Sequence, residues 1–202
     1  MVALDGYRLA VSTEKMNSGQ ENHFIISAKI INEISKIIAE DGDAEEVEIY
    51  LGKKKATFRI DTTEIVLRLM EGEYIKYRDI MPTQSTTDIV IGRAILQESI
   101  ERASLLAREG KNNLIKMTIK NNLLTITSRS EEGNVKEEII MEKEGEDLEI
   151  GFNSKFVIDV LKVIDDDEIS MHFLTGTSPC MVKPVSGDAY EYLILPVRIP
   201  TM

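Results

Sequence analysis

The segment FIISAKIINEISKII, residues 24–38, aligns without a gap with IGFNSKFVIDVLKVI, residues 150–164, at a constant offset of 126 residues. The alignment joins like charges: Lys29 with Lys155, Lys36 with Lys162, and Glu33 with Asp159. Each segment is followed by an acidic loop and a strand-like run, VEIYL at 47–51 and ISMHF at 169–173. Two unrelated amphipathic helices could match by chance, but the matching runs downstream favour an internal repeat of one αβ unit.

The two copies of this unit differ in completeness. The second begins near Ile89 and places a helix from Arg93 and a pair of strands before the repeated helix. At the same offset, the first copy would begin before Met1. We therefore expect the first unit to lack its opening helix and strands, as in the later part of a longer chain.

Periodicity outside the repeat indicates an α+β protein. Apolar residues at helical spacing predict helices at 27–38, 93–109 and 153–164. The pair Asp5-Gly6 is a strong hairpin signal, because a tight turn needs positive φ angles that glycine tolerates. Runs bounded by turn residues predict strands at 2–4, 7–12, 46–51, 56–61, 63–70, 114–120, 123–129, 135–142, 168–174, 181–185 and 190–198. Antiparallel sheets with amphipathic helices packed on one face follow from this pattern.

Composition excludes several classes of protein. The net charge of −11 among 202 residues argues against indiscriminate adhesion to nucleic acid or anionic lipid, although it does not locate the 24 basic residues. The single cysteine, Cys180, excludes an internal disulfide framework and fits a reducing cytoplasm. The first residues, MVALDGYRLAVS, lack the basic start and the apolar stretch of a signal peptide.

Four motifs carry a resemblance to a known family. ALDGYRLAV at 3–11, LMEGEYIKYRDIMP at 69–82, EIGFNSKFVIDVL at 149–161 and YLILPVR at 192–198 resemble the bacterial sliding clamp, the beta subunit of DNA polymerase III. The resemblance implies a DNA-clamp fold of repeated units, with an incomplete second clamp domain at 1–76 and a complete third domain at 77–202. It also implies a non-enzymatic replication factor that encircles duplex DNA without reading its sequence.

The resemblance further implies a pocket that binds short peptide motifs of DNA polymerase III and clamp-loader subunits, rich in glutamine and large apolar side chains. The implied lining is Leu4, Gly6, Tyr7, Arg8, Leu9, Ile75, Ile80, Asn153, Phe156, Cys180, Leu193, Ile194, Leu195, Pro196, Val197 and Arg198. Three positions depart from the family pattern, where threonine, proline and serine are usual: Leu4, Ile75 and Cys180. The alternative is that LILPV is simply a core strand, and both readings can hold because alternate residues of a strand face opposite sides.

Cations on the predicted helices are candidates for phosphate contacts, because a sliding surface must meet phosphates without reading bases. The candidates are Lys29, Lys36, Arg102, Arg108, Lys111, Lys155 and Lys162. The alternative is that they are ordinary solvated residues, interleaved with acids such as Glu33, Glu101 and Asp159.

Ring closure is the remaining property that the resemblance implies. In the family, two chains join head to tail, and Leu105 and Leu106 match the helix that forms this subunit interface. The docking partner would belong to the absent first domain. We therefore expect that this chain alone does not close a normal homodimer ring.

Catalytic and metal-binding motifs are not evident in the sequence. His23 and His172 have no cysteine or second histidine close by in sequence, so structural roles are favoured over metal ligation. We expect no catalytic residues and no cofactor. The alternatives that remain are a small cytosolic hydrolase or transferase that uses paired carboxylates, and a disabled clamp fragment that only binds peptides.

Overall fold

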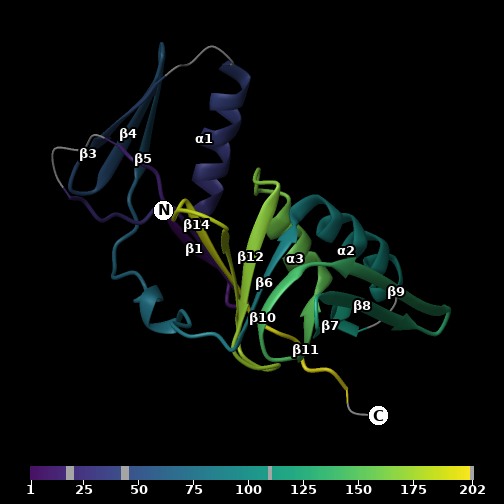
Figure 1. Ribbon diagram of the computed structural model, residues 1–202. Helices are drawn as coiled ribbons and strands as arrows, with labels where there is room; N and C mark the ends of the chain where they lie inside the picture. Colours follow the sequence, from purple (N-terminus) through teal and green to yellow (C-terminus); the bar gives the residue numbers. More distant parts are fainter. Residues whose placement is uncertain (17–20, 42–45, 109–110, 201–202) are drawn as a thin grey trace. The chain divides into compact units, whose positions relative to one another are not determined.

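The computed structural model describes residues 1–16, 21–41, 46–108 and 111–200 (Figure 1). The chain divides into two compact units. The larger contains Met1–Lys15 and Arg78–Met202, and the smaller contains Met16–Tyr77. The N-terminal hairpin therefore shares a unit with the second half of the chain, and the domain limits 1–76 and 77–202 stay a prediction.

The larger unit contains a seven-stranded sheet in the order β1-β2-β14-β13-β12-β6-β10, in which every neighbouring pair is antiparallel. Its strands are β1 (Val2–Leu4), β2 (Arg8–Ser12), β6 (Thr87–Gly92), β10 (Glu142–Gly145), β12 (Glu168–Phe173), β13 (Cys180–Pro184) and β14 (Tyr190–Ile194). The Asp5-Gly6 turn has the predicted positive φ, 87° at Gly6. Strand β2 pairs with β14, the last strand of the chain, so the β1–β2 hairpin forms one edge of this sheet.

A second sheet and two helices complete this unit. The sheet runs β11-β7-β8-β9, with β7 (Leu114–Lys120), β8 (Leu123–Ser130), β9 (Gly133–Ile140) and β11 (Leu148–Asn153). Helix α2 (Arg93–Ala107) packs on β7, β8 and β9 and against α3 (Ser154–Leu161) (Figure 1). The helices bury the apolar stripes that their periodicity predicts; Leu96, Ile100 and Val157 are at most 1% exposed. Two short 3-10 turns, η1 (Tyr77–Ile80) and η2 (Lys111–Asn113), lie outside the sheets.

In its described residues, the smaller unit contains one α-helix and one three-stranded meander. Helix α1 (Ala28–Asp41) precedes the sheet β3-β4-β5, formed by β3 (Val47–Leu51), β4 (Lys55–Ile60) and β5 (Thr63–Arg68). Alternate residues of β4 point inward, so that Ala56, Phe58 and Ile60 form a small core with Ile34.

The structure supports the internal repeat at the level of single hydrogen bonds. Each repeated helix precedes an antiparallel three-stranded run, β3-β4-β5 after α1 and β12-β13-β14 after α3. Met70 N–H donates to Ile25 O at 2.9 Å, and Val197 N–H donates to Gly151 O at 2.8 Å. Ile25 and Gly151 are aligned positions of the repeat, so the two copies close with the same backbone contact.

Three strands were absent from the sequence-based expectation, namely β6, β10 and β11. The expected strand at 135–142 is two strands, because the chain changes sheets at the buried Met141: β9 pairs with β8, and β10 pairs with β6. The expected strand at 190–198 ends at Ile194. Beyond it, single hydrogen bonds replace ladder pairing: Leu195 N–H donates to Tyr7 O, and Val197 N–H donates to Gly151 O.

Candidate functional site

An aromatic and cationic cluster lies where the β1–β2 turn meets α3. The rings of Tyr7 and Phe156 stack with their centroids 5.6 Å apart. The guanidinium carbon of Arg8 lies 4.8 Å from the centre of the Phe156 ring, within the range of a cation–π contact. Phe156 therefore contacts two consecutive residues of the hairpin, and α3 fixes where the turn is held.

Two carboxylates hold Arg8 in this position. Its Nε donates to Asp5 Oδ2 at 2.8 Å, and its Nη1 donates to Asp159 Oδ2 at 2.6 Å. The hydrogen bond to Asp159 is the main reason that the pKa of Arg8 is raised above its ordinary value. Partial burial works to raise the pKa of Asp5, but the Arg8 guanidinium and the backbone N–H groups of Tyr7 and Arg8 outweigh it, so this pKa is lowered. The cluster thus combines one guanidinium, that of Arg8, with two carboxylates, those of Asp5 and Asp159.

The segment after β14 closes the site from the C-terminal side. Leu195 N–H donates to Tyr7 O at 2.9 Å, and Val197 N–H donates to Gly151 O at 2.8 Å. A Cβ atom at Gly151 would lie 2.6 Å from Val197 O, so the glycine is needed for this close approach. Asn153 caps α3 by accepting from Lys155 N–H at 3.0 Å. The hairpin, the C-terminal segment and the start of α3 are thus joined by direct contacts.

The expected pocket residues divide into exposed and buried groups. Leu4, Tyr7 and Ile80 are 39%, 62% and 47% exposed, which is high for large apolar side chains. Arg8, Asn153, Phe156, Leu195, Pro196 and Val197 are half-buried, and Gly6 and Arg198 are exposed. The buried group cannot meet a peptide directly, because its side chains are at most 4% exposed: Leu9, Cys180, Leu193 and Ile194. These four side chains pack in the core beneath the site. For Cys180, burial raises the pKa of the thiol. Ile75 lies in the smaller unit and is exposed.

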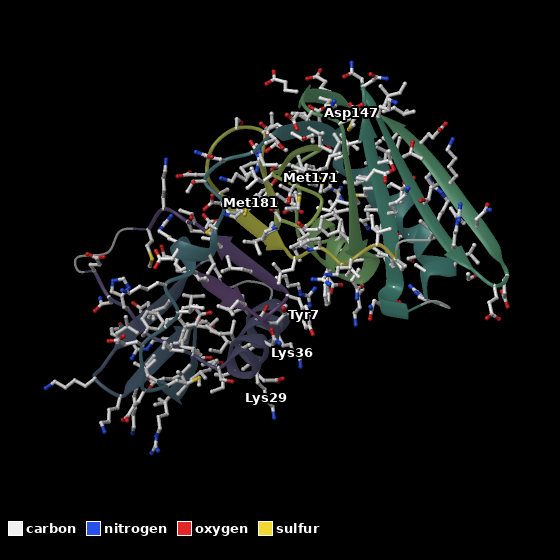
Figure 2. The ribbon with its side chains drawn as sticks, turned by 90° about the horizontal axis from the view of Figure 1, so that it is seen from below. Tyr7, Lys29, Lys36, Asp147, Met171 and Met181 are labelled. Atoms are coloured by element: carbon white, nitrogen blue, oxygen red, sulfur yellow. The ribbon has the colours of Figure 1, made fainter. Side chains whose placement is uncertain are left out.

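The candidate DNA-facing cations lie on helices α1, α2 and α3 or just after α2 and α3, except Lys111, which begins η2. Figure 2 shows Lys29 and Lys36 on α1, where Lys36 Nζ lies 2.8 Å from Glu33 Oε1. In the larger unit, Lys155, Lys162 and Arg108 are exposed. Arg102 is also exposed, and its Nη2 lies 2.8 Å from Glu137 Oε2. The side chain of Lys111 lies outside the described part of the structure. Ion pairing thus partly neutralises this set, as the interleaved acids led us to expect.

The two leucines expected at a subunit interface differ in exposure. Leu105 is 64% exposed on α2, whereas Leu106 is half-buried. Ile95 of the same helix is also exposed, at 50%, so α2 presents more than one apolar side chain that is available for contact with another chain.

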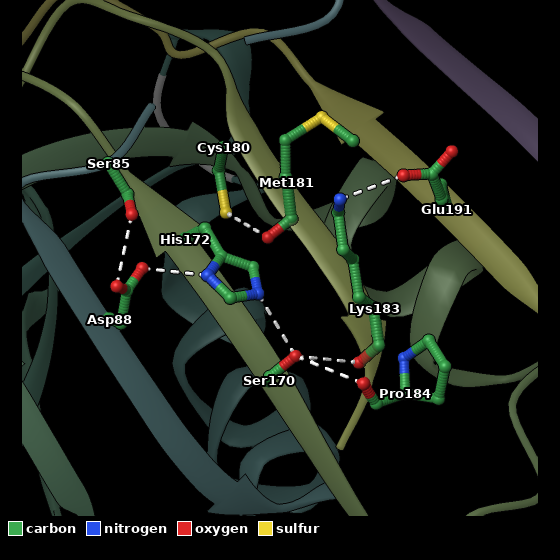
Figure 3. A network of polar contacts seen from close by, with 9 residues as sticks. All are labelled: Ser85, Asp88, Ser170, His172, Cys180, Met181, Lys183, Pro184 and Glu191. Carbon is green, nitrogen blue, oxygen red and sulfur yellow. Dashed lines mark hydrogen bonds and ion pairs between the residues drawn. The ribbon is translucent and has the colours of Figure 1, made fainter. Parts of the chain in front are cut away.

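His172 lies in a network of hydrogen bonds within the seven-stranded sheet. Figure 3 shows its ring between Asp88 and Ser170: Nδ1 lies 2.7 Å from Asp88 Oδ1, and Nε2 lies 3.1 Å from Ser170 Oγ. The same three residue types form hydrolytic triads. Here, however, Ser170 is buried, and its Oγ lies 3.2 Å and 3.3 Å from the carbonyl oxygens of Lys183 and Pro184. Carbonyl oxygens would repel an oxyanion, so the network ties β6, β12 and β13 together and does not support the hydrolase alternative.

The sequence-based candidates omitted two residues of the site, Asp5 and Asp159 in their contact with Arg8. Asp5 had a local signal, since it lies three residues before Arg8 across a tight turn. The pairing of Asp159 had none, because 151 residues separate it from Arg8.

Within the described part of the chain, no helix is long and apolar enough to cross a membrane.

Comparison with known proteins agrees with this arrangement. Residues 1–76 match the family model of the DNA polymerase III beta subunit, central domain, and residues 78–198 match that of its C-terminal domain. The beta sliding clamp of Staphylococcus epidermidis is 38% identical over 199 residues, covering 97% of this chain and 52% of the relative. The DNA polymerase sliding clamp of Bacillus subtilis superimposes with a TM-score of 0.92 at 33% identity, covering 98% of this chain and 53% of that one.

The beta subunit of Thermotoga maritima gives a TM-score of 0.90 at 33% identity, covering 98% of this chain and 54% of that one. The chain thus spans about half the length of the curated relatives that it matches. With both family models matched in order, this chain belongs to the family of the DNA polymerase III beta subunit, the beta sliding clamps.

Proposed function

We propose that the chain serves DNA replication as part of a sliding clamp in the cytoplasm. It holds a polymerase through short peptide motifs and contacts duplex DNA without sequence preference. The observation that carries the proposal is the stacked Tyr7–Phe156 pair with Arg8 held against it, in a chain of the beta-clamp family. The role is one of binding, and no bond is made or broken.

The peptide site follows from the chemistry of the cluster. An exposed aromatic ring and neighbouring apolar residues, Tyr7 and Leu4, offer surface for large apolar side chains of a peptide. Arg8 has further N–H groups beyond those used by Asp5 and Asp159, and these can donate to a glutamine side chain or a peptide carbonyl. A motif that combines glutamine with leucine and phenylalanine fits both features.

The DNA contact follows from the distribution of charge. The total charge is −11, yet exposed lysines recur at aligned positions of α1 and α3, such as Lys29 and Lys155. Lysine contacts with phosphates are long-range and carry no sequence information. Interleaved acids keep such contacts weak, and weak contacts permit sliding.

A fluorescently labelled peptide that contains glutamine, leucine and phenylalanine tests the proposal. We expect the full chain to bind it with a Kd on the order of micromolar. The double variant Arg8→Ala/Leu195→Ala should weaken binding at least about tenfold, which corresponds to about 1.4 kcal/mol. The matched control Arg59→Ala/Leu123→Ala removes the same residue types elsewhere and should bind as the unchanged chain does. Equal binding by both double variants would contradict the proposed site.

Retention on DNA separates a working clamp from a fragment that only binds peptides. A chain that encircles DNA stays on a closed circle and slides off a linear duplex of the same length. We propose that, as part of an assembled ring, the chain shows this difference. Equal retention on circular and linear DNA would support the alternative of a disabled fragment.

A further inference from the structure

Asp159 is shared by the two candidate sites. It lies on α3 between Lys155 and Lys162, four residues after the first and three before the second. At these spacings the three side chains lie along one side of the helix. The Asp159 carboxylate is bound by Arg8 from the hairpin, at 2.6 Å. One acid therefore faces both the peptide site and the cations proposed to contact DNA.

The other copy of the repeat shows a different partner for the equivalent acid. Glu33 of α1 aligns with Asp159, and Lys36 aligns with Lys162. In α1 the lysine binds the acid directly, with Lys36 Nζ 2.8 Å from Glu33 Oε1. In α3, by contrast, Asp159 is bound by Arg8, and Lys162 lies 4.0 Å from Glu101. The same helical spacing therefore supports two arrangements, and Arg8 is what distinguishes them.

We propose that Asp159 is a switchable counter-ion that couples peptide binding to DNA binding; this inference rests on the proposed function. In the chain without peptide, Arg8 binds the carboxylate, and the contact of Lys162 with Glu101 is long, at 4.0 Å, so that Lys155 and Lys162 can still meet phosphates. A peptide oxygen first accepts from N–H groups of Arg8 that Asp5 and Asp159 do not use, and it then draws the guanidinium away from Asp159. Asp159 then pairs with Lys162, as Glu33 pairs with Lys36, and the cationic side of α3 is partly neutralised.

The sign and size of the coupling follow from the exposure of these groups. The side chains of Arg8 and Asp159 are 30% and 40% exposed, and that of Lys162 is 57% exposed. Ion pairs at such positions are weak, so we expect bound peptide to weaken DNA binding by about 2- to 5-fold. Because coupling between two binding equilibria is reciprocal, DNA should weaken peptide binding by the same factor.

The test measures the affinity of the full chain for a short fluorescein-labelled duplex at low salt, with and without saturating peptide. The peptide is the unlabelled version of the one used above, and saturation is set from the peptide Kd of each variant. The unchanged chain should show the 2- to 5-fold weakening. Asp159→Asn removes the switchable charge and should bind the duplex equally with and without peptide. The matched control Glu33→Gln, in the other copy of the repeat, should retain the factor of the unchanged chain.

The outcomes are distinguishable from failure of the proposed function. If the unchanged chain binds both ligands but its duplex Kd does not respond to peptide, the coupling is absent and the inference falls. The inference also falls if Asp159→Asn retains the full factor. If the peptide or the duplex does not bind at all, the proposed function fails together with it. The reciprocal measurement, peptide Kd with and without duplex, checks the same factor independently.

Discussion

The backbone of Val197 lies directly on that of Gly151. Val197 N–H donates to Gly151 O at 2.8 Å, and a Cβ atom at Gly151 would come within 2.6 Å of Val197 O. The contact fastens the segment after β14 to the strand that leads into α3. The C-terminal side of the candidate peptide site thus depends on a position without a side chain.

We expect Gly151→Ala to destabilise the larger unit and to weaken peptide binding. The added methyl group would meet backbone, which cannot move aside as a side chain can. Overpacking of this kind costs about 1–3 kcal/mol, or roughly 2–12 °C in Tm for a chain of this size. Gly92→Ala is the matched control, because its Cβ would meet only the side-chain tip of Ile95, at 3.2 Å. Thermal unfolding followed by circular dichroism checks the result, and equal Tm values for the two variants would contradict it.

Tyr7→Ala should weaken peptide binding by about 2- to 12-fold, because the exposed ring can pair with the phenylalanine of the peptide, and an aromatic pair contributes about 0.5–1.5 kcal/mol beyond its buried area. Tyr7 is 62% exposed, so the Tm should change little. Tyr50→Ala removes another exposed tyrosine, on β3, and should leave the peptide Kd unchanged. Fluorescence anisotropy measures all three affinities. A Tyr7→Ala chain that binds as tightly as the unchanged one would exclude the ring from the site.

The ion pair between Lys116 and Glu149 should make stability depend on pH. Hydrogen bonds from Lys116 and Thr118 lower the pKa of Glu149, more than partial burial raises it. A lowered pKa in the folded state stabilises the fold above the unfolded value, about 4.3, and this contribution is lost as the pH falls through the folded pKa. Glu149→Gln should therefore lower the Tm by a few degrees at pH 7, since an exposed pair contributes at most about 1 kcal/mol. The difference should begin to shrink as the pH falls through the unfolded value, about 4.3, and should vanish once the pH is below the folded pKa. A difference that stays constant from pH 7 to pH 3 would show that charge is not its cause.

Truncation to alanine should destabilise the fold strongly at Leu96 and hardly at all at Leu105, although both residues lie on α2. Leu96 is 0% exposed, so Leu96→Ala should cost about 2–5 kcal/mol. Leu105 is 64% exposed, so Leu105→Ala should change the free energy of unfolding by no more than about 0.5 kcal/mol. Urea titration of the two variants measures both values. If Leu105 forms a subunit contact, its truncation should instead shift the oligomeric state in light scattering.

Several elements were readable from local pattern alone. The apolar stripes of α2 and α3 and the positive φ of Gly6 follow from periods and turn chemistry that involve near neighbours in sequence. Strand β6 was missed although Ile89, Val90 and Ile91 form a short apolar run in the sequence, and only the structure shows that its residues alternate in burial. Strand β10 had none: Glu142–Gly145 is mostly charged and becomes a strand only by pairing with β6.

The candidate site shows the same division. Tyr7, Arg8 and Phe156 were predicted from motifs that resemble the family, and their role in binding a peptide stays a prediction. That Phe156 stacks on Tyr7, and that Asp159 binds Arg8, became visible only in the structure. The sequence likewise did not predict that Leu193 and Ile194 are buried beneath the site, because an apolar strand can turn either face outward.

The sequence by itself determined the repeat, the helical stripes and the family, because these depend on residue types at fixed short spacings. The tertiary structure alone decided that the N-terminal hairpin pairs with β14, and that Gly151, Asp159 and the C-terminal segment meet around it. The physical reason is that strand pairing and ion pairs join groups far apart in the chain. Their partners are selected by the packing of the whole unit, which no local spacing records.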